Sequence, residues 1–308
     1  MPAQAAAADE EDMLDLFEDS LTNLFDEYMP AKGSPQSLYT YTPPVGAPLT
    51  CRIPQNETSL NSLFAHFVWR GSAVLADAIA TGAVDVEGED VLEMGAGTGI
   101  PGLMAARSAR KVVLSDYDND AIISNLKSNI SLAYPDSPDI RARLHAIGHS
   151  WGEEDSLQAL LTANTSLPFT RILLADTLWY SEGHFLLLSS LSRLLARSSS
   201  ARIHICAGFH SGRSTVRSFL KKARREGFIM QGKWEEVGIE GQRRDWGWDV
   251  KPKEGAGAGE GERREDEEVE GEWEEKENSS ERNKWVVMGE LGWSDERLQS
   301  VESIEGIE

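Results

Sequence analysis

The sequence predicts an α/β fold with a mainly parallel sheet, on three observations. From Val91 to about Arg225, short apolar segments alternate with helical patterns, as in sheets that carry helices on both faces. A glycine-rich turn directly follows the first of these strands. After Gly227 the alternation stops, and Phe228–Val237 and Lys284–Leu291 are two further strands with no helix between them. Together these features predict seven strands, the last two of them an antiparallel C-terminal hairpin.

The five predicted parallel strands are short and apolar, and the helices between them have apolar residues on one face. The strands are Val91–Met94, Val112–Ser115, Arg143–Ile147, Arg171–Ala175 and Arg202–Ala207, and the helices are Pro101–Ser108, Ala121–Ile130, Leu157–Thr162, Phe185–Leu195 and Thr215–Arg225. Before the sheet, a helical pattern runs from Ser59 to Ile79, with a stop at Gly82. Repeated prolines in residues 36–56 predict an extended approach to this helix.

The net charge of −21 is concentrated in three segments and leaves the rest of the chain neutral. Residues 1–30 carry −9, residues 251–282 carry −7 and residues 289–308 carry −5. We therefore expect an acidic, largely disordered tail over 1–35, one domain over 36–293 with a disordered insert at 251–282, and an acidic tail over 294–308. Apolar residues from Leu14 to Phe25 recur at helical spacing and indicate either a docking helix or transient helicity.

Composition also excludes several classes of partner and site. A chain of this charge is a poor binder of nucleic acid and of anionic membranes, and no apolar run approaches the roughly 20 residues that span a bilayer. Cys51 and Cys206 have neither metal-ligand nor CxxC spacing, which predicts reduced thiols and no metal site. The start of the chain lacks the pattern of a signal peptide, and we expect a cytoplasmic protein.

The glycine turn Glu93-x-Gly95-x-Gly97-x-Gly99 predicts a nucleoside site. Such a turn lets a ligand approach the backbone, and Asp116, at the end of the next strand, can accept hydrogen bonds from both ribose hydroxyls. Glu93 and the C-terminal hairpin favour S-adenosylmethionine over a dinucleotide, although the spacing of the glycines also fits the dinucleotide fingerprint. Asp116 has an alternative role as the cap of the following helix.

A second acidic residue, Asp176, ends the fourth strand and is followed by Trp179 and Tyr180. Because ligands of open α/β sheets bind beyond the carboxyl ends of the strands, these side chains are candidates for the reacting end of the site. The aromatic rings suit an amine substrate through cation–π attraction, and the alternative is a helix cap with core aromatics. Trp69 and Trp151 are candidates for cofactor stacking or for core packing, and His210 is a weaker candidate for a base or a substrate contact.

Several motifs together carry a resemblance to one family. The chain resembles the seven-β-strand (Class I) protein-lysine methyltransferases of the nicotinamide N-methyltransferase-like group, most nearly the fungal enzymes that methylate the N-terminus and lysines of elongation factor 1-alpha. The carriers are residues 24–27, 66–69, 91–101, 115–117, 149–152 and 174–180, and the resemblance covers roughly residues 13–250 and 284–293. It implies a Rossmann-like fold and cofactor contacts at Trp69, Gly95, Ala96, Gly97, Asp116, Trp151 and Ala175.

The resemblance implies an S-adenosylmethionine-dependent transfer to a protein lysine or N-terminal amine, with elongation factor 1-alpha as the candidate acceptor and a monomeric enzyme. Asp176, Trp179 and Tyr180 are then the catalytic residues. Tyr180 stands where the elongation-factor enzymes commonly have Asn, and the acidic insert also departs from the family. Methylation of a small amine, an NAD-dependent oxidoreductase and a non-catalytic cofactor-binding module are the alternatives.

Overall fold

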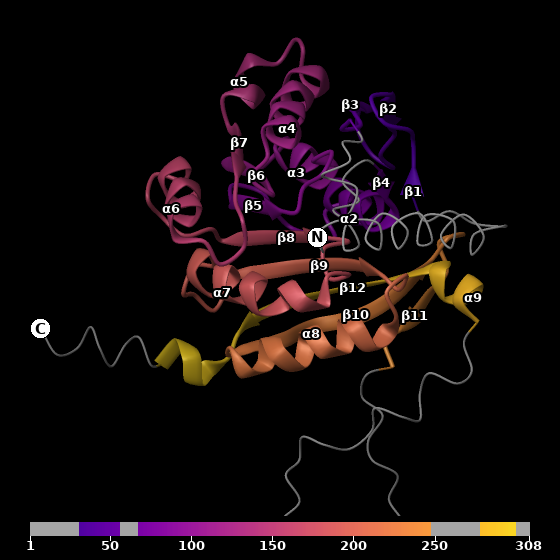
Figure 1. Ribbon diagram of the computed structural model, residues 1–308, viewed down its shortest axis with the longest axis vertical. Coiled ribbons are helices and arrows are strands. Elements are labelled where there is room, and N and C mark those ends of the chain that lie inside the picture. The colour runs from indigo at the N-terminus through magenta and orange to yellow at the C-terminus, as the bar shows by residue number, and fades with distance from the viewer. Residues whose placement is uncertain (1–30, 56–66, 248–277, 300–308) are drawn as a thin grey trace, which may run out of the picture.

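The computed structural model describes residues 31–55, 67–247 and 278–299. Its centre is an eight-stranded sheet in the order β11-β10-β12-β9-β8-β5-β6-β7 (Figure 1). The parallel strands are β5 (Asp90–Met94), β6 (Lys111–Asp116), β7 (Leu144–Gly148), β8 (Arg171–Ala175) and β9 (Arg202–Gly208), and the antiparallel strands are β10 (Phe228–Gly238), β11 (Arg243–Asp245) and β12 (Trp285–Trp293). The predicted mainly parallel sheet with an antiparallel C-terminal hairpin is confirmed. The unpredicted strand β11 extends the edge, and β12 lies between β9 and β10.

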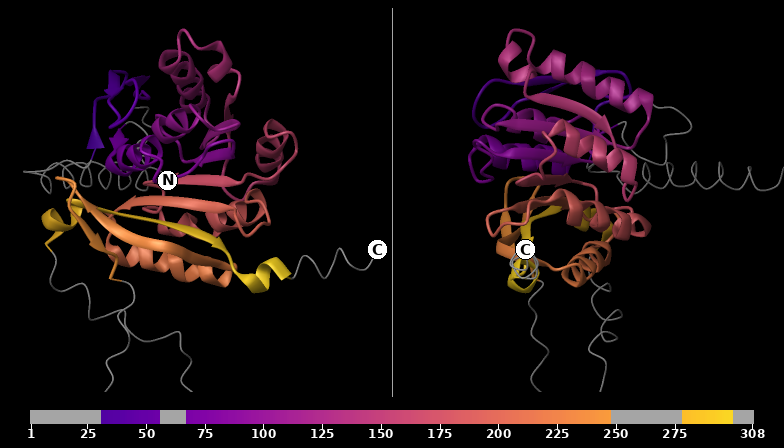
Figure 2. Two further views of the ribbon diagram at one scale, coloured as in Figure 1. Left: turned by 180° about the vertical axis from the view of Figure 1, so that it is seen from behind. Right: turned by 90° about the vertical axis from the view of Figure 1, so that its left-hand side faces the viewer.

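Helices cover both faces of this sheet, as the three views together show (Figures 1 and 2). One core contains apolar residues of α2 (Arg70–Ala80), α3 (Ile100–Ala105) and α4 (Asp120–Ala133), and the other contains those of α6 (Glu154–Ala163), α7 (His184–Leu194) and α8 (Arg213–Arg225). Successive strand residues point to opposite faces. Val91 therefore belongs to the first core, while its neighbour Leu92 belongs to the second. Two short helices, α5 (Pro138–Arg141) and η2 (Ser181–Gly183), lie in the connections.

The segment before the sheet differs from its prediction. The expected extended approach is a hairpin of β2 (Leu38–Tyr41) and β3 (Leu49–Arg52), and its alternate residues Leu49 and Cys51 are buried. Within the predicted tail, β1 (Ala31–Lys32) pairs with β4 (Val68–Trp69). Val68 and Trp69 lie on a strand where a helix was expected, and α2 begins at Arg70. The part of the predicted helix between Ser59 and residue 66 lies outside the described residues. The pairing of β1 with β4, which lie far apart in the sequence, accounts for the strands at Ala31 and Trp69, whereas the prolines conceal the local hairpin of β2 and β3.

One C-terminal boundary also needs correction. The predicted insert at 251–282 ends earlier, because α9 (Ser279–Asn283) is a helix whose start is capped by the side chain of Asn278. Within the predicted acidic tail over 294–308, residues 295–299 are helical and Leu298 packs against the second core. The remainder of the insert and the apolar pattern from Leu14 to Phe25 lie outside the described residues. None of the helices that the structure describes is long and apolar enough to cross a membrane.

Candidate active site

The ten residues predicted for the site line a single cavity of about 680 Å³ at the carboxyl ends of the parallel strands. They come from β4, from the last residues of β6 and β8, and from the loops after β5, β7 and β8, so five separate segments of the chain contribute. The remaining lining residues are Phe67, Ser72, Thr98, Tyr117, His149, Ser150, Thr177 and Leu186. Ser72 and Leu186 lie outside the motifs used in the sequence analysis, and Thr98 and Thr177 lie inside two of these motifs without a predicted role.

The glycine turn between β5 and α3 forms one wall of the cavity. Gly95, Gly97 and Gly99 have positive φ angles of 66°, 53° and 80°, in the left-handed region that favours glycine. At Gly95 a β-carbon would lie 2.5 Å from Cγ2 of Thr177. Any side chain at this position would therefore clash, and the bare backbone is what borders the cavity.

Asp116 closes the turn from the neighbouring strand. Its Oδ2 accepts a hydrogen bond from the backbone N–H of Gly97, and its Oδ1 accepts one from that of Tyr117, both at 2.7 Å. Burial raises the pKa of this carboxyl, and the two N–H groups oppose that shift. The predicted alternative role as a helix cap is wrong, because the side chain of Asn119 caps α4. The further lone pairs of the carboxylate leave it able to accept hydroxyl donors from the cavity.

Glu93 supports the turn from behind and does not line the cavity. Its Oε2 accepts a hydrogen bond from the backbone N–H of Gly102 at 2.8 Å and so ties β5 to the first turn of α3. Complete burial raises the pKa of Glu93 to about 8 from its ordinary 4.5, and its Oε1 has no hydrogen-bond partner. The protonated acid is therefore the main form at neutral pH.

His149 fixes the loop that carries Trp151, a role the sequence did not indicate. Its two ring nitrogens lie 2.8 Å from the Ser156 hydroxyl and 2.9 Å from the Ser190 hydroxyl, and Ser190 also accepts a hydrogen bond from the N–H of Gly152. Burial lowers the pKa of His149 to about 4. This neutral imidazole joins the β7 loop to α6 and α7 and holds the half-buried Trp151 at the cavity wall.

Asp176 lines the cavity, and its backbone is in the left-handed region, with a φ of 53°. Its Oδ2 accepts a hydrogen bond from the N–H of Gly71 and its Oδ1 accepts one from the N–H of Gly208, both at 2.5 Å. Burial raises the pKa of this carboxyl, against the opposing effects of His210 and the two N–H groups. Asp176 therefore caps a helix, as the alternative prediction allowed. The helix is α2, whose own N-cap residue makes no side-chain capping hydrogen bond.

Aromatic rings surround the outer part of the cavity. Trp179 is half-buried and Tyr180 is exposed, with ring centroids 5.7 Å apart. Trp69 stacks on His210 with centroids 4.9 Å apart, and His210 does not itself line the cavity. His210 therefore supports Trp69 from behind, which leaves it without access to a ligand in this cavity.

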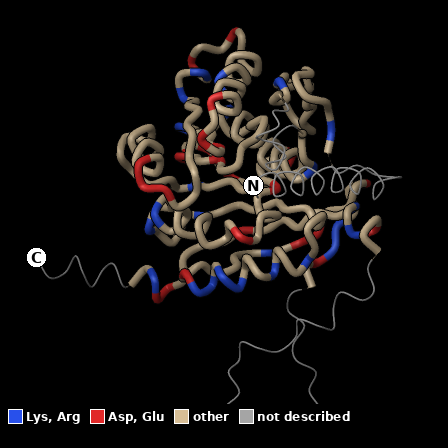
Figure 3. Tube along the Cα trace, in the orientation of Figure 1, with Lys and Arg blue, Asp and Glu red and all other residues tan. Residues whose placement is uncertain are grey.

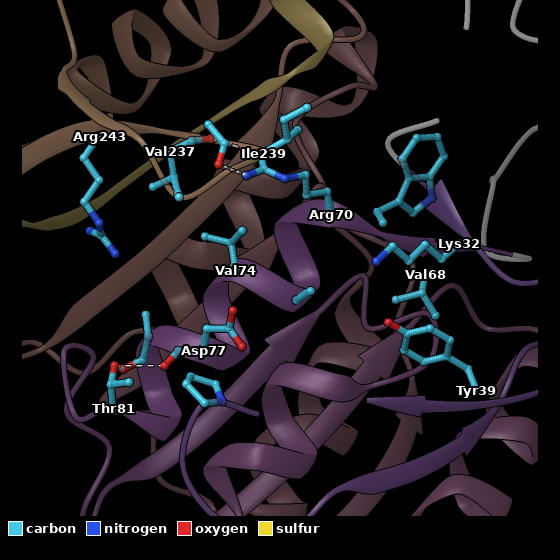
Figure 4. A pocket seen from close by; sticks show the side chains of 16 residues that line it. Lys32, Tyr39, Val68, Arg70, Val74, Asp77, Thr81, Val237, Ile239 and Arg243 are labelled. Carbon is cyan, nitrogen blue, oxygen red and sulfur yellow. Dashed lines mark hydrogen bonds between the residues drawn. The ribbon is translucent and has the colours of Figure 1, made fainter. Parts of the chain in front are cut away.

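A second cavity of about 480 Å³ lies along α2, between the N-terminal strands and β10 (Figure 4). Of the ten predicted residues only Trp69 borders it. The Arg70 guanidinium, beside this cavity, donates hydrogen bonds to the carbonyls of Val237 and Gly238. Among the described residues, no group of three His, Cys, Asp or Glu side chains is placed to hold a metal ion.

Comparison with known proteins agrees with this geometry. Residues 52–226 match the lysine methyltransferase family. Three of the chain's relatives are named protein N-terminal and lysine N-methyltransferase. The one from Schizosaccharomyces pombe is 27% identical over 57% of this chain and 69% of the relative, and the one from Aspergillus fumigatus is 31% identical over 44% of this chain and 53% of the relative. The one from Gibberella zeae is 28% identical over 67% of this chain and 80% of the relative. A solved TehB-like methyltransferase from Corynebacterium glutamicum aligns with a TM-score of 0.41 at 16% identity, over 73% of this chain and 88% of that chain, too distant to bear on the assignment. The family match covers more than half of the chain, which therefore belongs to the lysine methyltransferase family, enzymes that take their methyl group from S-adenosylmethionine.

Proposed function

We propose that this chain methylates an amine nitrogen of a protein, either a lysine side chain or an N-terminal amino group. The observation that carries the proposal is that one cavity joins the glycine turn and Asp116 to the aromatic pair Trp179 and Tyr180. The glycine turn and Asp116 suit a nucleoside, and the two aromatic rings suit an approaching cationic amine.

The residues present fit S-adenosylmethionine. Asp116 would accept hydrogen bonds from the ribose hydroxyls, the backbone at Gly95 would lie beside the ligand where no side chain is tolerated, and Trp151 would stack on the adenine. The bound sulfonium supplies an electrophilic methyl carbon. The chain has to position an amine in line with it and to present that amine without its proton.

Deprotonation follows from the surroundings of the amine. A lysine has a pKa near 10.4 in water, and enclosure in the cavity lowers it because burial disfavours the charged form, against the cation–π attraction of Trp179 and Tyr180. His149 does not serve as the base, since both of its ring nitrogens are bound to serine hydroxyls. Asp176 is held by two backbone N–H groups and fixes the frame of the site. Water at the cavity mouth takes the proton.

We further propose elongation factor 1-alpha as the acceptor, with the enzyme acting as a monomer in the cytoplasm. Support comes from the motifs shared with the fungal enzymes and from the names of the relatives, which specify protein N-terminal and lysine methylation. Tyr180 departs from the Asn of the elongation-factor enzymes, so the acceptor requires a direct test.

Two measurements test the proposal. Calorimetry with S-adenosylmethionine and S-adenosylhomocysteine should detect binding, and labelled S-adenosylmethionine should label purified, unmethylated elongation factor 1-alpha. Lysine-to-arginine variants and an acceptor with a blocked N-terminus then locate the methyl group. Label found only in added nicotinamide or other small amines would overturn the protein acceptor, and binding without transfer to any acceptor would favour a non-catalytic module.

A further inference from the structure

Large apolar side chains are exposed around the mouth of the cofactor cavity. Tyr117, Tyr180, Phe185 and Leu186 have exposed fractions of 49%, 43%, 60% and 51%. Tyr117, Tyr180 and Leu186 also line the cavity, and Phe185 precedes Leu186 at the start of α7. Exposed apolar groups that gather at one place mark an interaction surface, whereas single ones are ordinary.

A lysine completes this group of side chains. Lys222 of α8 places its Nζ 5.1 Å from the centroid of the Phe185 ring and donates a hydrogen bond to the carbonyl of Ser181 at 3.4 Å. Ser181 directly follows Tyr180, so Lys222 contacts both the ring of Phe185 and the backbone next to Tyr180. Figure 1 shows α7 and α8 side by side, and Figure 3 shows the basic residues along α8.

Lys222 differs from other basic residues of α8 in what it contacts. The guanidinium of Arg213 is paired with the buried Glu236, and that of Arg217 lies over the ring of Trp246. The charges of these two residues are therefore engaged within the fold. Among the described residues, no carboxylate lies within ion-pair distance of Lys222. Its charge is therefore available to an acidic group of a partner.

We propose that Tyr180, Phe185, Leu186 and Lys222 form the docking surface for the methyl-accepting protein. That protein presents an apolar side chain to the three apolar residues and a carboxylate to Lys222, beside the amine that enters the cavity. Two observations favour this occupant: the surface is continuous with the cavity lining, and its one available cation complements an acidic group. This inference rests on the proposed function, because it requires a protein acceptor.

Titration of the acceptor tests the surface. Full-length enzyme with labelled S-adenosylmethionine is assayed against dilutions of protein extract from cells that lack the enzyme, and label is followed in the protein fraction. For Phe185→Ala and Lys222→Glu, we expect the half-saturating acceptor concentration to rise about tenfold, with the rate at saturation nearly unchanged. Lys222→Arg should retain wild-type behaviour. Phe185→Ala is the decisive variant, because Phe185 does not line the cavity.

Matched controls and a binding measurement separate the outcomes. Ile229→Ala, at an exposed apolar residue of β10, and Lys221→Glu, beside Lys222 on α8, should leave the half-saturating concentration unchanged. Calorimetry should give all variants the wild-type affinity for S-adenosylmethionine. Wild-type half-saturation in Phe185→Ala and Lys222→Glu, or an equal effect in Lys221→Glu, would overturn the surface while the proposed function stands. A wild-type enzyme that binds the cofactor and labels no protein would overturn both.

Discussion

Asp176 accepts a hydrogen bond from the backbone N–H of Gly71 at 2.5 Å, across 105 positions of the sequence. Its other oxygen accepts one from Gly208 at the end of β9. The first N–H groups of a helix have no partner within the helix, and a negative charge there is stabilised by the helix dipole. A single carboxylate that lines the cavity thus fixes the start of α2 and the end of β9.

Replacement of this carboxylate tests whether it holds α2 and β9 together. In Asp176→Asn the amide offers one acceptor oxygen and one donor nitrogen, so one of the two N–H groups loses its partner. A buried unsatisfied donor costs about 1–3 kcal/mol, and we expect the free energy of unfolding in urea to fall by that amount. Asp136→Asn, at an exposed position, is the control. Unchanged stability together with lost turnover would instead place Asp176 in direct contact with the acceptor.

Cofactor affinity should depend on Asp116. Asp116→Ala removes the acceptor proposed for the ribose hydroxyls and the hydrogen bonds that hold the backbone of Gly97 and Tyr117. Charge-assisted hydrogen bonds contribute about 1.5–3 kcal/mol, so the dissociation constant for S-adenosylmethionine should rise by at least about tenfold in calorimetry. Asp136→Ala should bind normally. Wild-type affinity in Asp116→Ala would exclude the ribose assignment.

The buried acid Glu93 makes stability fall as the pH rises. Its pKa is about 8 in the folded protein and near 4.5 when solvated, so between these values the folded chain keeps a proton that the unfolded chain has lost. From this group the free energy of unfolding declines by about 1.4 kcal/mol per pH unit across that window. Glu93→Gln imitates the protonated form and should remove this component in urea melts from pH 5 to 8. Parallel pH profiles for the two proteins would show that Glu93 is ionised in the fold.

His149 acts in the opposite direction, at acidic pH. Its pKa is about 4 in the fold and near 6.5 when solvated, so the unfolded chain binds an extra proton between these values. Its contribution is complete above pH 6.5 and is lost as the pH falls toward 4, by about 3 kcal/mol. His184 and His204 also have lowered pKa values and add to the same trend. The free energy of unfolding of His149→Gln should therefore fall less than that of wild type between pH 6.5 and 4. An equal fall would contradict the role of His149 as a neutral imidazole between the two serine hydroxyls.

Local sequence patterns were sufficient to predict the elements that depend on residues close together in the chain. Strands such as Val91–Met94 were predicted from runs of apolar residues. The turn after Met94 was predicted from its glycines, which adopt the left-handed backbone that this turn requires. The hairpin of β2 and β3 was missed because its prolines conceal the alternation that buries Leu49 and Cys51. The helix α9 was missed because it ends a segment of low complexity.

The sequence by itself predicted the fold class, the glycine turn and ten site residues, because most of these residues lie at a strand end or in the loop that follows it. Tertiary structure alone decided the role of Asp176, which is one of the ten, and that of His149, which is not. Asp176 caps a helix that begins at Arg70, and His149 is neutral between hydroxyls of α6 and α7. Hydrogen-bond partners and burial set these roles, and both arise only when segments distant in the chain pack together.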